Sequence, residues 1–274
     1  MKKFNLGLQL YSVRGEMAKD FEGTLKKVSE IGYKYVEFAG YFGKSAKEIK
    51  AILEKYGLVC ESVHQTLSIN DEAKAKEEVE FLKELGVKYV FIPWYDKEKL
   101  AGTEAWCETV ENFRKMAALL KEYGMTLGYH NHDFEFARHE GKFLHDHIFD
   151  EIGRENIIPE LDTCWVRYAG LDPAAKIMEF KGYVPVVHLK DFTCKELASG
   201  PVYELIGGAS AQKTDNGFRF RPVGSGMQDF KAILEACEMA GTDSVIVEQD
   251  SCYEEGEISA ITSSYEYLTS NFGL

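Results

Sequence analysis

Apolar residues along this chain recur in a repeated unit, which consists of an amphipathic stretch, a glycine and a short run rich in Val, Ile, Tyr and Phe. The clearest copies span residues 25–40, 49–64, 79–94, 116–131 and 233–250. The glycine of each copy stands where a helix ends in positive φ, at Gly32, Gly57, Gly86, Gly124 and Gly241. The runs that follow have the composition of buried strands. Helix, glycine and strand in repetition predict a parallel α/β fold.

Eight strands are expected when the pattern is followed through the whole chain. They are Leu6–Leu10, Tyr35–Phe38, Leu58–Val63, Tyr89–Ile92, Thr126–His130, Ile157–Leu161, Val184–Leu189 and Ser244–Val247, with a closing helix at about Ile258–Ser270. A doubly wound sheet would have fewer strands and a glycine-rich phosphate turn after the first one. That strand instead ends in Gln9-Leu10 and continues into Tyr11-Ser12, without a GxGxxG motif. The pattern therefore predicts an α/β protein with one domain over residues 1–274, a (β/α)8 TIM barrel.

Two connections are longer than the others and lie where a barrel binds its substrate. They span about residues 131–142 and 192–222. Because long loops after strands lie on the carboxyl-terminal face, we expect lids there. The alternative is a decorative insertion or an oligomer contact.

The composition limits the kinds of ligand that the protein is expected to bind and the cellular compartment in which it is expected. The chain of 274 residues has a formal net charge of −13, with 45 acidic and 32 basic residues. That balance argues against nucleic-acid binding and favours a small-molecule ligand. The 6 cysteines form no CxxC pair and no long apolar run suggests a membrane span, so a reduced, cytoplasmic protein is expected. A homo-oligomer is expected only because many TIM barrel proteins form oligomers.

Polar residues gather at the predicted strand ends, which all converge on one mouth in a barrel. Four successive strands end in a metal-ligand set: His130, Asp162, His188 and Glu248. Imidazoles with carboxylates suit Mn²⁺, Co²⁺, Zn²⁺ or Mg²⁺. Taken singly, such carboxylates are more often helix caps, and Asp162 before Thr163 fits that reading. Lys190 shares a strand face with His188, because side chains alternate along a strand.

Several motifs resemble the sugar phosphate isomerase/epimerase family, which has a xylose isomerase-like TIM barrel. They are GLQLYSVR (7–14), GYHNHDFEF (128–136), LDTCW (161–165), VVHLKDF (186–192), PVGSGMQDF (222–230) and VIVEQD (245–250). The resemblance implies a divalent metal held by Asp162, His188 and Glu248. The family has a glutamate at the fourth position, where this chain has His130-Asn131-His132. His130 is nearest by spacing, and His132 shares its face.

The resemblance implies an isomerase or epimerase of a sugar, keto-sugar or sugar phosphate, acting by α-proton abstraction through a metal-stabilised enediolate. Glu248 would move a proton on one side and His130 or His132 on the other. Lys190 would stabilise the enolate oxygen or assist a leaving hydroxyl, and a salt bridge to a mouth carboxylate is the alternative for this lysine. The alternative is a dehydratase or eliminating lyase on a keto-inositol or 3-keto-glycoside. Both outcomes share one enolate.

Other residues are expected around the substrate or away from it. Gln9, Glu37, His64 and Trp94 are candidates for substrate binding, with local capping or core packing as the alternative. The Gly224-Ser225-Gly226 turn either binds phosphate through its amides or is a plain loop. His139, His145 and His147 lie in a polar stretch and are expected to be solvated. A DNA-repair barrel is disfavoured by the charge, and a non-catalytic sugar-binding barrel stays open.

Overall fold

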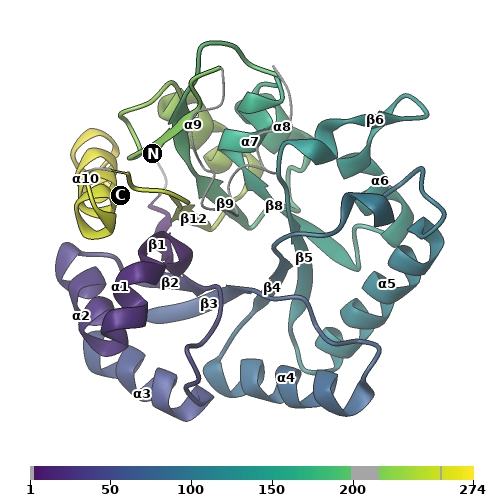
Figure 1. Cartoon of the computed structure of the whole chain (residues 1–274), viewed down its shortest axis with the longest axis horizontal. Helices are drawn as coiled ribbons and strands as arrows, with labels where there is room; N and C mark the ends of the chain where they lie inside the picture. Colours follow the sequence, from purple (N-terminus) through teal and green to yellow (C-terminus); the bar gives the residue numbers. More distant parts are fainter. Residues whose placement is uncertain (1–2, 199–215, 254) are drawn as a thin grey trace.

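A closed barrel of parallel strands organises the protein, seen down its axis in Figure 1. The computed structural model describes residues 3–198, 216–253 and 255–274. Within these residues the barrel contains eight strands in the order β1-β12-β9-β8-β5-β4-β3-β2. They are β1 (Asn5–Gln9), β2 (Tyr35–Phe38), β3 (Val59–His64), β4 (Tyr89–Ile92), β5 (Thr126–His130), β8 (Ile157–Asp162), β9 (Val186–Leu189) and β12 (Ser244–Val247). The predicted (β/α)8 barrel is confirmed, and strand bounds differ by two residues at most.

Helices surround the barrel as an outer ring (Figure 1). They are α1 (Arg14–Lys19), α2 (Phe21–Ile31), α3 (Ala46–Tyr56), α4 (Glu72–Leu85), α5 (Trp106–Glu122), α6 (Leu144–Ile152), α7 (Thr163–Tyr168), α8 (Pro173–Glu179), α9 (Phe230–Ala240) and α10 (Glu257–Phe272). Short 3₁₀ turns lie at η1 (Leu10–Val13), η2 (Lys97–Lys99) and η3 (Phe134–Phe136). In the described residues, no helix is both long and apolar enough to cross a bilayer.

The repeated sequence unit explains the packing of this ring. Apolar faces of the helices cover the barrel, and the strands themselves are almost wholly buried. The five glycines expected at helix ends all have positive φ. Gly57, for example, ends α3 in the left-handed conformation and turns the chain into β3. β1 pairs with both β2 and β12, so the first and last barrel strands close the ring.

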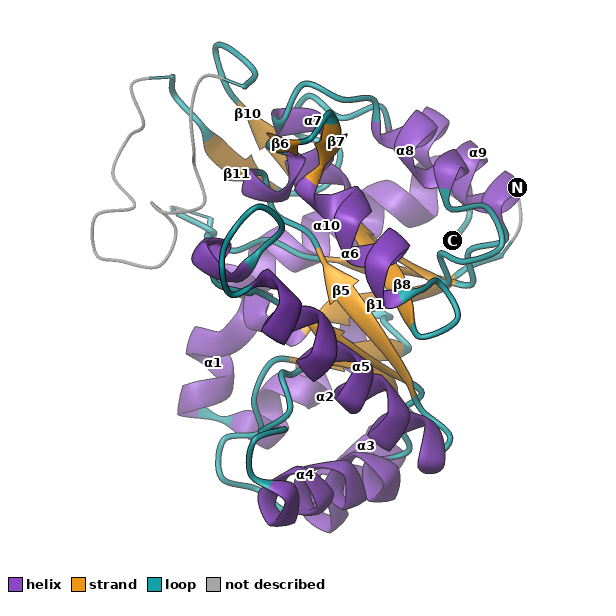
Figure 2. Cartoon of the chain, turned by 90° about the vertical axis from the view of Figure 1, so that its right-hand side faces the viewer, coloured by secondary structure: helices purple, strands orange, loops and turns teal. Residues whose placement is uncertain are grey.

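Both long loops begin at carboxyl ends of barrel strands. After β5 the chain forms η3 and a hairpin of β6 (Arg138–His139) and β7 (Lys142–Phe143). After β9 it forms β10 (Asp191–Thr193) and β11 (Arg219–Arg221), which pair antiparallel. Figure 2 shows both hairpins on the same end of the molecule. Residues 199–215 of the second predicted lid lie outside the described part, and lid closure stays a prediction.

One expectation outside the barrel was wrong. His145 and His147 are buried on α6, whereas the polar composition of their segment predicted solvation. α6 is amphipathic, and His145 lies on its covered face among the rings of Phe136, Phe149 and Phe180. Tertiary packing of the helix therefore overrides the local polarity. His139, at the hairpin, is partly exposed as expected.

Candidate active site

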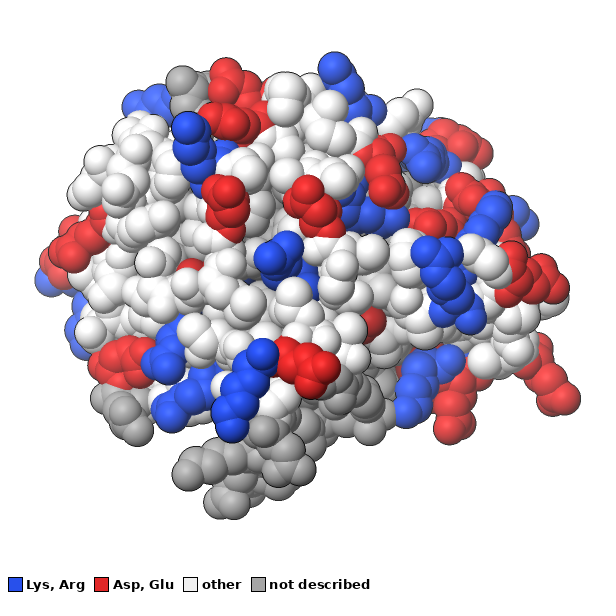
Figure 3. All heavy atoms as spheres, turned by 90° about the horizontal axis from the view of Figure 1, so that it is seen from above, with Lys and Arg blue, Asp and Glu red and all other residues white. Residues whose placement is uncertain are grey.

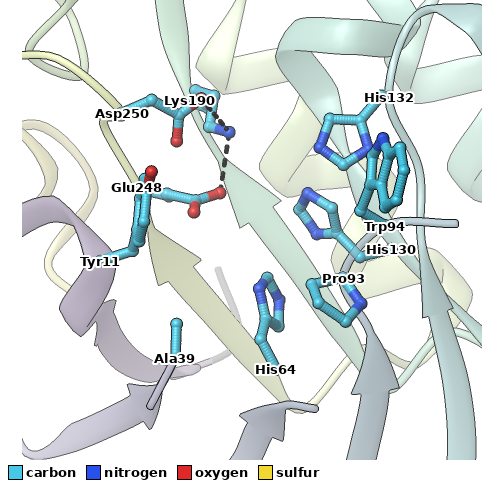
Figure 4. Close-up of a pocket in the computed structure, with 10 residues that line it drawn as sticks. All are labelled: Tyr11, Ala39, His64, Pro93, Trp94, His130, His132, Lys190, Glu248 and Asp250. Carbon is cyan, nitrogen blue, oxygen red and sulfur yellow. Dashed lines mark hydrogen bonds and ion pairs between the residues drawn. The ribbon is translucent and has the colours of Figure 1, made fainter. Parts of the chain in front are cut away.

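A cavity of about 350 Å³ opens at the carboxyl ends of the barrel strands. Its lining, drawn in Figure 4, consists of Tyr11, Ala39, His64, Pro93, Trp94, His130, His132, Lys190, Glu248 and Asp250. Lys190, Glu248 and Asp250 lie on one wall, and His130 and His132 with Trp94 lie on the other. Barrels of this kind bind ligands at this face. The cavity is therefore the candidate active site.

Four side chains near the cavity are arranged as a metal-ligand set. His130, Asp162, His188 and Glu248 each offer one ligand atom, and these atoms lie within 4.8 Å of one another. His188 Nδ1 lies 3.0 Å from Glu248 Oε2, and His130 Nε2 lies 3.7 Å from Asp162 Oδ2. Two ligands about 2.1 Å from one ion lie roughly 3 to 3.5 Å apart. The spacing of this set, which we name the mouth tetrad, suits a divalent cation.

The partners of three buried carboxylate oxygens support the same fit. Among the described residues, Glu37 Oε2 accepts no hydrogen bond. Glu160 Oε1 and Asp162 Oδ2 are held by ion pairs, at 3.2 Å from His188 Nε2 and 2.9 Å from Lys190 Nζ. Asp162 also caps α7, because its Oδ1 accepts from the amides of Cys164 and Trp165. Asp162 can therefore be a helix cap through Oδ1 and a metal ligand through Oδ2. Buried carboxylates in excess are favourable where a cation binds.

A second polar layer lies beneath the mouth tetrad and consists of Gln9, Glu37, His64 and Glu160. Glu160 precedes Asp162 by two residues on β8, so both point inward and Glu160 lies nearer the amino end. His64 Nε2 lies 2.6 Å from Glu160 Oε2 and 3.0 Å from Glu37 Oε1. Gln9 Nε2 donates to Glu37 Oε1 at 2.7 Å. Burial alone would lower the pKa of His64, but Glu37 and Glu160 raise it to about 10. We name this set the lower layer.

Lys190 is surrounded by carboxylates on the other side of the mouth. Its Nζ lies 2.8 Å from Glu248 Oε2, 2.9 Å from Asp162 Oδ2 and 3.1 Å from Asp250 Oδ2. Burial opposes ionisation of Glu248, yet Lys190 and His188 hold the pKa of that carboxyl well below its usual range. Burial raises the pKa of Asp250 to about 6, with Lys190 acting in the opposite direction. Glu248 is thus an ionised base beside an ammonium.

The opposite wall carries neutral imidazoles and an indole. Burial lowers the pKa of His130 and of His132 well below the usual value, so both rings are uncharged near neutral pH. The backbone amide of His132 donates to Glu135 Oε2, and Tyr129 donates to Glu135 Oε1. Burial raises the pKa of Glu135 to about 8. Glu135 thereby fixes the start of the loop that presents His132 to the cavity.

The predicted site residues occupy different depths. His64, Trp94, His130, His132, Lys190 and Glu248 line the cavity. Gln9 and Glu37 are fully buried in the lower layer, and their contact with substrate stays a prediction. Glu160 and Asp250 also end strands in the sequence pattern but were not among the predicted site residues, and Asp250 before Ser251 was interpreted as a possible cap. Glu160 could have been found from its spacing of two residues to Asp162, which places both on the inner face of β8.

The Gly224-Ser225-Gly226 turn serves the fold. Its amides at Gly224 and Gly226 donate to Asp191 Oδ2, and those of Met227 and Gln228 donate to Asp191 Oδ1. A Cβ on Gly226 would lie 2.2 Å from Asp191 Oδ1, so only glycine fits. The carboxylate of Asp191 takes the place that a phosphate would need. Of the two readings of this turn, the structure favours the plain loop.

Comparison with known proteins places this chain among TIM barrels. A model of the family described as xylose isomerase-like TIM barrel matches residues 25–267. The inosose dehydratase of Geobacillus kaustophilus (strain HTA426) is 25% identical over 194 residues, which are 61% of this chain and 61% of that protein. The inosose dehydratase of Geobacillus thermodenitrificans (strain NG80-2) is 23% identical over 266 residues, covering 90% of this chain and 86% of the relative. The first match thus spans less than two thirds of the relative.

Solved structures share the fold. A sugar phosphate isomerase/epimerase from Parabacteroides distasonis ATCC 8503 superposes with a TM-score of 0.79 at 20% identity, covering 99% of this chain and 96% of that one. The IolI protein, described with a binding zinc atom, superposes with a TM-score of 0.70 at 17% identity, covering 97% of each chain. At these identities the likeness concerns the fold alone.

Proposed function

Because the chain belongs to the xylose isomerase-like TIM barrel family, we propose that it is a metal-dependent carbon–oxygen lyase. It would remove the α-proton of a neutral keto-cyclitol or keto-glycoside and expel an oxygen from the next carbon. The observation that carries the proposal is the Glu248–Lys190 pair, a base and a proton donor 2.8 Å apart on one wall of the cavity. The inosose dehydratases among the relatives support the same reaction class.

The mechanism needs one base, one acid and an electrophile. The Glu248 carboxylate takes the proton from the carbon beside the substrate carbonyl. A carbon–carbon double bond forms as the C–O bond at the next carbon breaks, and Lys190 Nζ gives a proton to the departing oxygen. Water or an alcohol leaves, and an unsaturated ketone remains. A divalent cation held by His130, Asp162, His188 and Glu248 would supply Lewis acidity at the carbonyl.

A neutral substrate is proposed because the mouth offers a phosphate no unshared cation among the described residues. Lys190 is the one Lys or Arg in the cavity lining, and three carboxylates already surround it. The turn amides that could cradle a phosphate donate to Asp191. Apart from the proposed cation, a dianion would therefore meet net negative charge from these three carboxylates. Figure 3 views the molecule from the side of the barrel, where basic and acidic residues are interspersed.

The test compares three compounds with the purified protein: a keto-inositol, a neutral 3-keto-glycoside and a phosphorylated keto-sugar. We expect one of the two neutral ketones to lose water or its aglycone, seen as enone absorbance and by mass. Chelation should abolish turnover, and addition of Mn²⁺, Co²⁺, Zn²⁺ or Mg²⁺ should restore it. Turnover of the phosphorylated compound alone, or full activity after complete metal removal, would contradict the proposal.

Isomerisation or epimerisation is the second candidate, and one observation favours it. His130 and His132 face Glu248 across the cavity, as a reaction with proton transfer on both faces of a carbon requires (Figure 4). Reaction in D₂O separates the two candidates. Deuterium in a product of unchanged carbon skeleton and oxygen content supports this candidate, whereas loss of the oxygen supports the lyase.

A further inference from the structure

The lower layer holds the two imidazoles of the mouth tetrad from below, and each ring is contacted at both of its nitrogens. Glu160 Oε2 lies 3.0 Å from His130 Nδ1, while the Nε2 of that ring faces Asp162. Glu37 Oε1 lies 2.9 Å from His188 Nε2, while the Nδ1 of that ring lies beside Glu248. Both rings thus have one nitrogen toward the mouth and one toward a buried carboxylate.

Carboxylates accept hydrogen bonds and do not donate them when ionised. A ring N–H therefore points down at Glu37 and at Glu160, so the mouth-facing nitrogen of each ring is the one that would give its lone pair to a cation. Without a cation, His188 Nδ1 also faces a carboxylate, Glu248, and the cation would take the place of the proton there. Partners of this kind fix the orientation of metal-binding histidines and raise their basicity. His64 contacts both carboxylates at 2.6 and 3.0 Å and keeps them side by side.

We propose that Glu37 and Glu160 are positioning residues, which hold His188 Nδ1 and His130 Nε2 toward the cation of the mouth tetrad. This inference rests on the proposed metal dependence. It assigns to Glu37 a role beneath the metal instead of a contact with sugar hydroxyls. It also gives a function to the two buried carboxylates of the lower layer, which place negative charge beneath the cation.

The lower layer offers a rival position for the ion itself. His64, His130, Glu160 and His188 also lie within 4.8 Å of one another. The 2.6 Å between His64 Nε2 and Glu160 Oε2 is a direct hydrogen bond and is shorter than the roughly 3 Å between two ligands of one ion. This distance favours the mouth tetrad.

The experiment measures metal binding without substrate, by competition with a chromogenic chelator for Co²⁺ and Zn²⁺ and by the visible spectrum of bound Co²⁺. The variants are Glu37→Gln and Glu160→Gln, with Glu248→Gln as a variant of a proposed ligand. Thr242→Val is the matched control, because its buried hydroxyl bonds the Val184 carbonyl at the amino end of the barrel. His64→Gln serves as a further lower-layer variant if either glutamine variant fails to fold.

We expect Glu37→Gln and Glu160→Gln to weaken metal binding about 10- to 100-fold and to change the Co²⁺ spectrum, with one ion still bound. Thr242→Val should keep the wild-type affinity and spectrum. Wild-type affinity and spectrum in all lower-layer variants would overturn the inference alone. Loss of the ion in Glu160→Gln with tight binding in Glu248→Gln would put the ion in the lower layer and overturn it too. A wild-type protein that binds no metal would instead overturn the proposed function.

Discussion

Two buried lysines in this barrel are each held by carboxylates, and the two clusters differ in how their charge is balanced. At the mouth, Lys190 contacts Asp162, Glu248 and Asp250, all of them buried. In the helical layer, Lys176 of α8 contacts Asp146 and Glu179, whose side chains are 30% and 59% exposed. Water can solvate the helix carboxylates but not those of the mouth. Excess negative charge without solvent is costly for folding and useful for binding a cation.

The largest expected effect is a loss of activity when the carboxylate cluster around Lys190 is changed. Glu248→Gln removes the proposed base, so we expect kcat to fall about 10³-fold, within the range of general acid–base contributions. Stability should change little, because Lys190 keeps Asp162 and Asp250 as partners. Steady-state kinetics and urea unfolding measure the two quantities. An active Glu248→Gln enzyme would remove the proposed base from the mechanism.

The helical cluster should give the reverse result. Lys176→Met keeps an unbranched apolar side chain but removes the ammonium, whose Nζ lies 5.5 Å from the ring centroids of Phe143 and Phe180. Loss of one partner of a buried pair costs roughly 3 to 5 kcal/mol, and the exposure of Asp146 and Glu179 reduces this to about 2 kcal/mol. We expect unchanged kcat and KM. A loss of activity equal to that of Glu248→Gln would show that the clusters do not differ as argued.

The residues at the strand ends were predictable from the sequence, because the alternation of side chains along a strand and the common mouth of a barrel do not depend on the register between strands. His130, Asp162, His188 and Glu248 end parallel strands, and all parallel strands of a barrel end at one mouth. Depth was not predictable in the same way. Glu37 follows a register shift between β2 and β3 at Val36, and such shifts are set by cross-strand packing. The hydrogen bonds from the backbone amides of residues 224–228 to Asp191 join residues far apart in the sequence, and no local sequence pattern predicts them.

The third prediction concerns the pH dependence of stability and tests a buried histidine of the helical layer, His145. Burial lowers the pKa of His145 to about 4, below the 6.5 of an unfolded chain. The unfolded state therefore binds more protons between pH 6.5 and 4, and stability is lost as the pH falls through this window. From about pH 7.5 to about pH 5 we expect His145 to contribute a loss of ~2 kcal/mol. Urea unfolding of wild type and His145→Phe at both pH values isolates the contribution of His145. Equal pH dependence of the free energy of unfolding in the two proteins would contradict the prediction.

The smallest expected effect concerns the wall opposite Lys190. Trp94 lines the cavity and is 46% exposed, so its indole is available to stack on an apolar face of a substrate. Removal of such a contact costs about 1 kcal/mol, and Trp94→Ala should raise KM about fivefold with kcat unchanged. Tyr183→Ala is the matched control, because Tyr183 is 47% exposed and precedes β9 at the amino end of the barrel. If Trp94→Ala lowered kcat as Glu248→Gln does, the indole would act in the chemical step and not only in substrate binding.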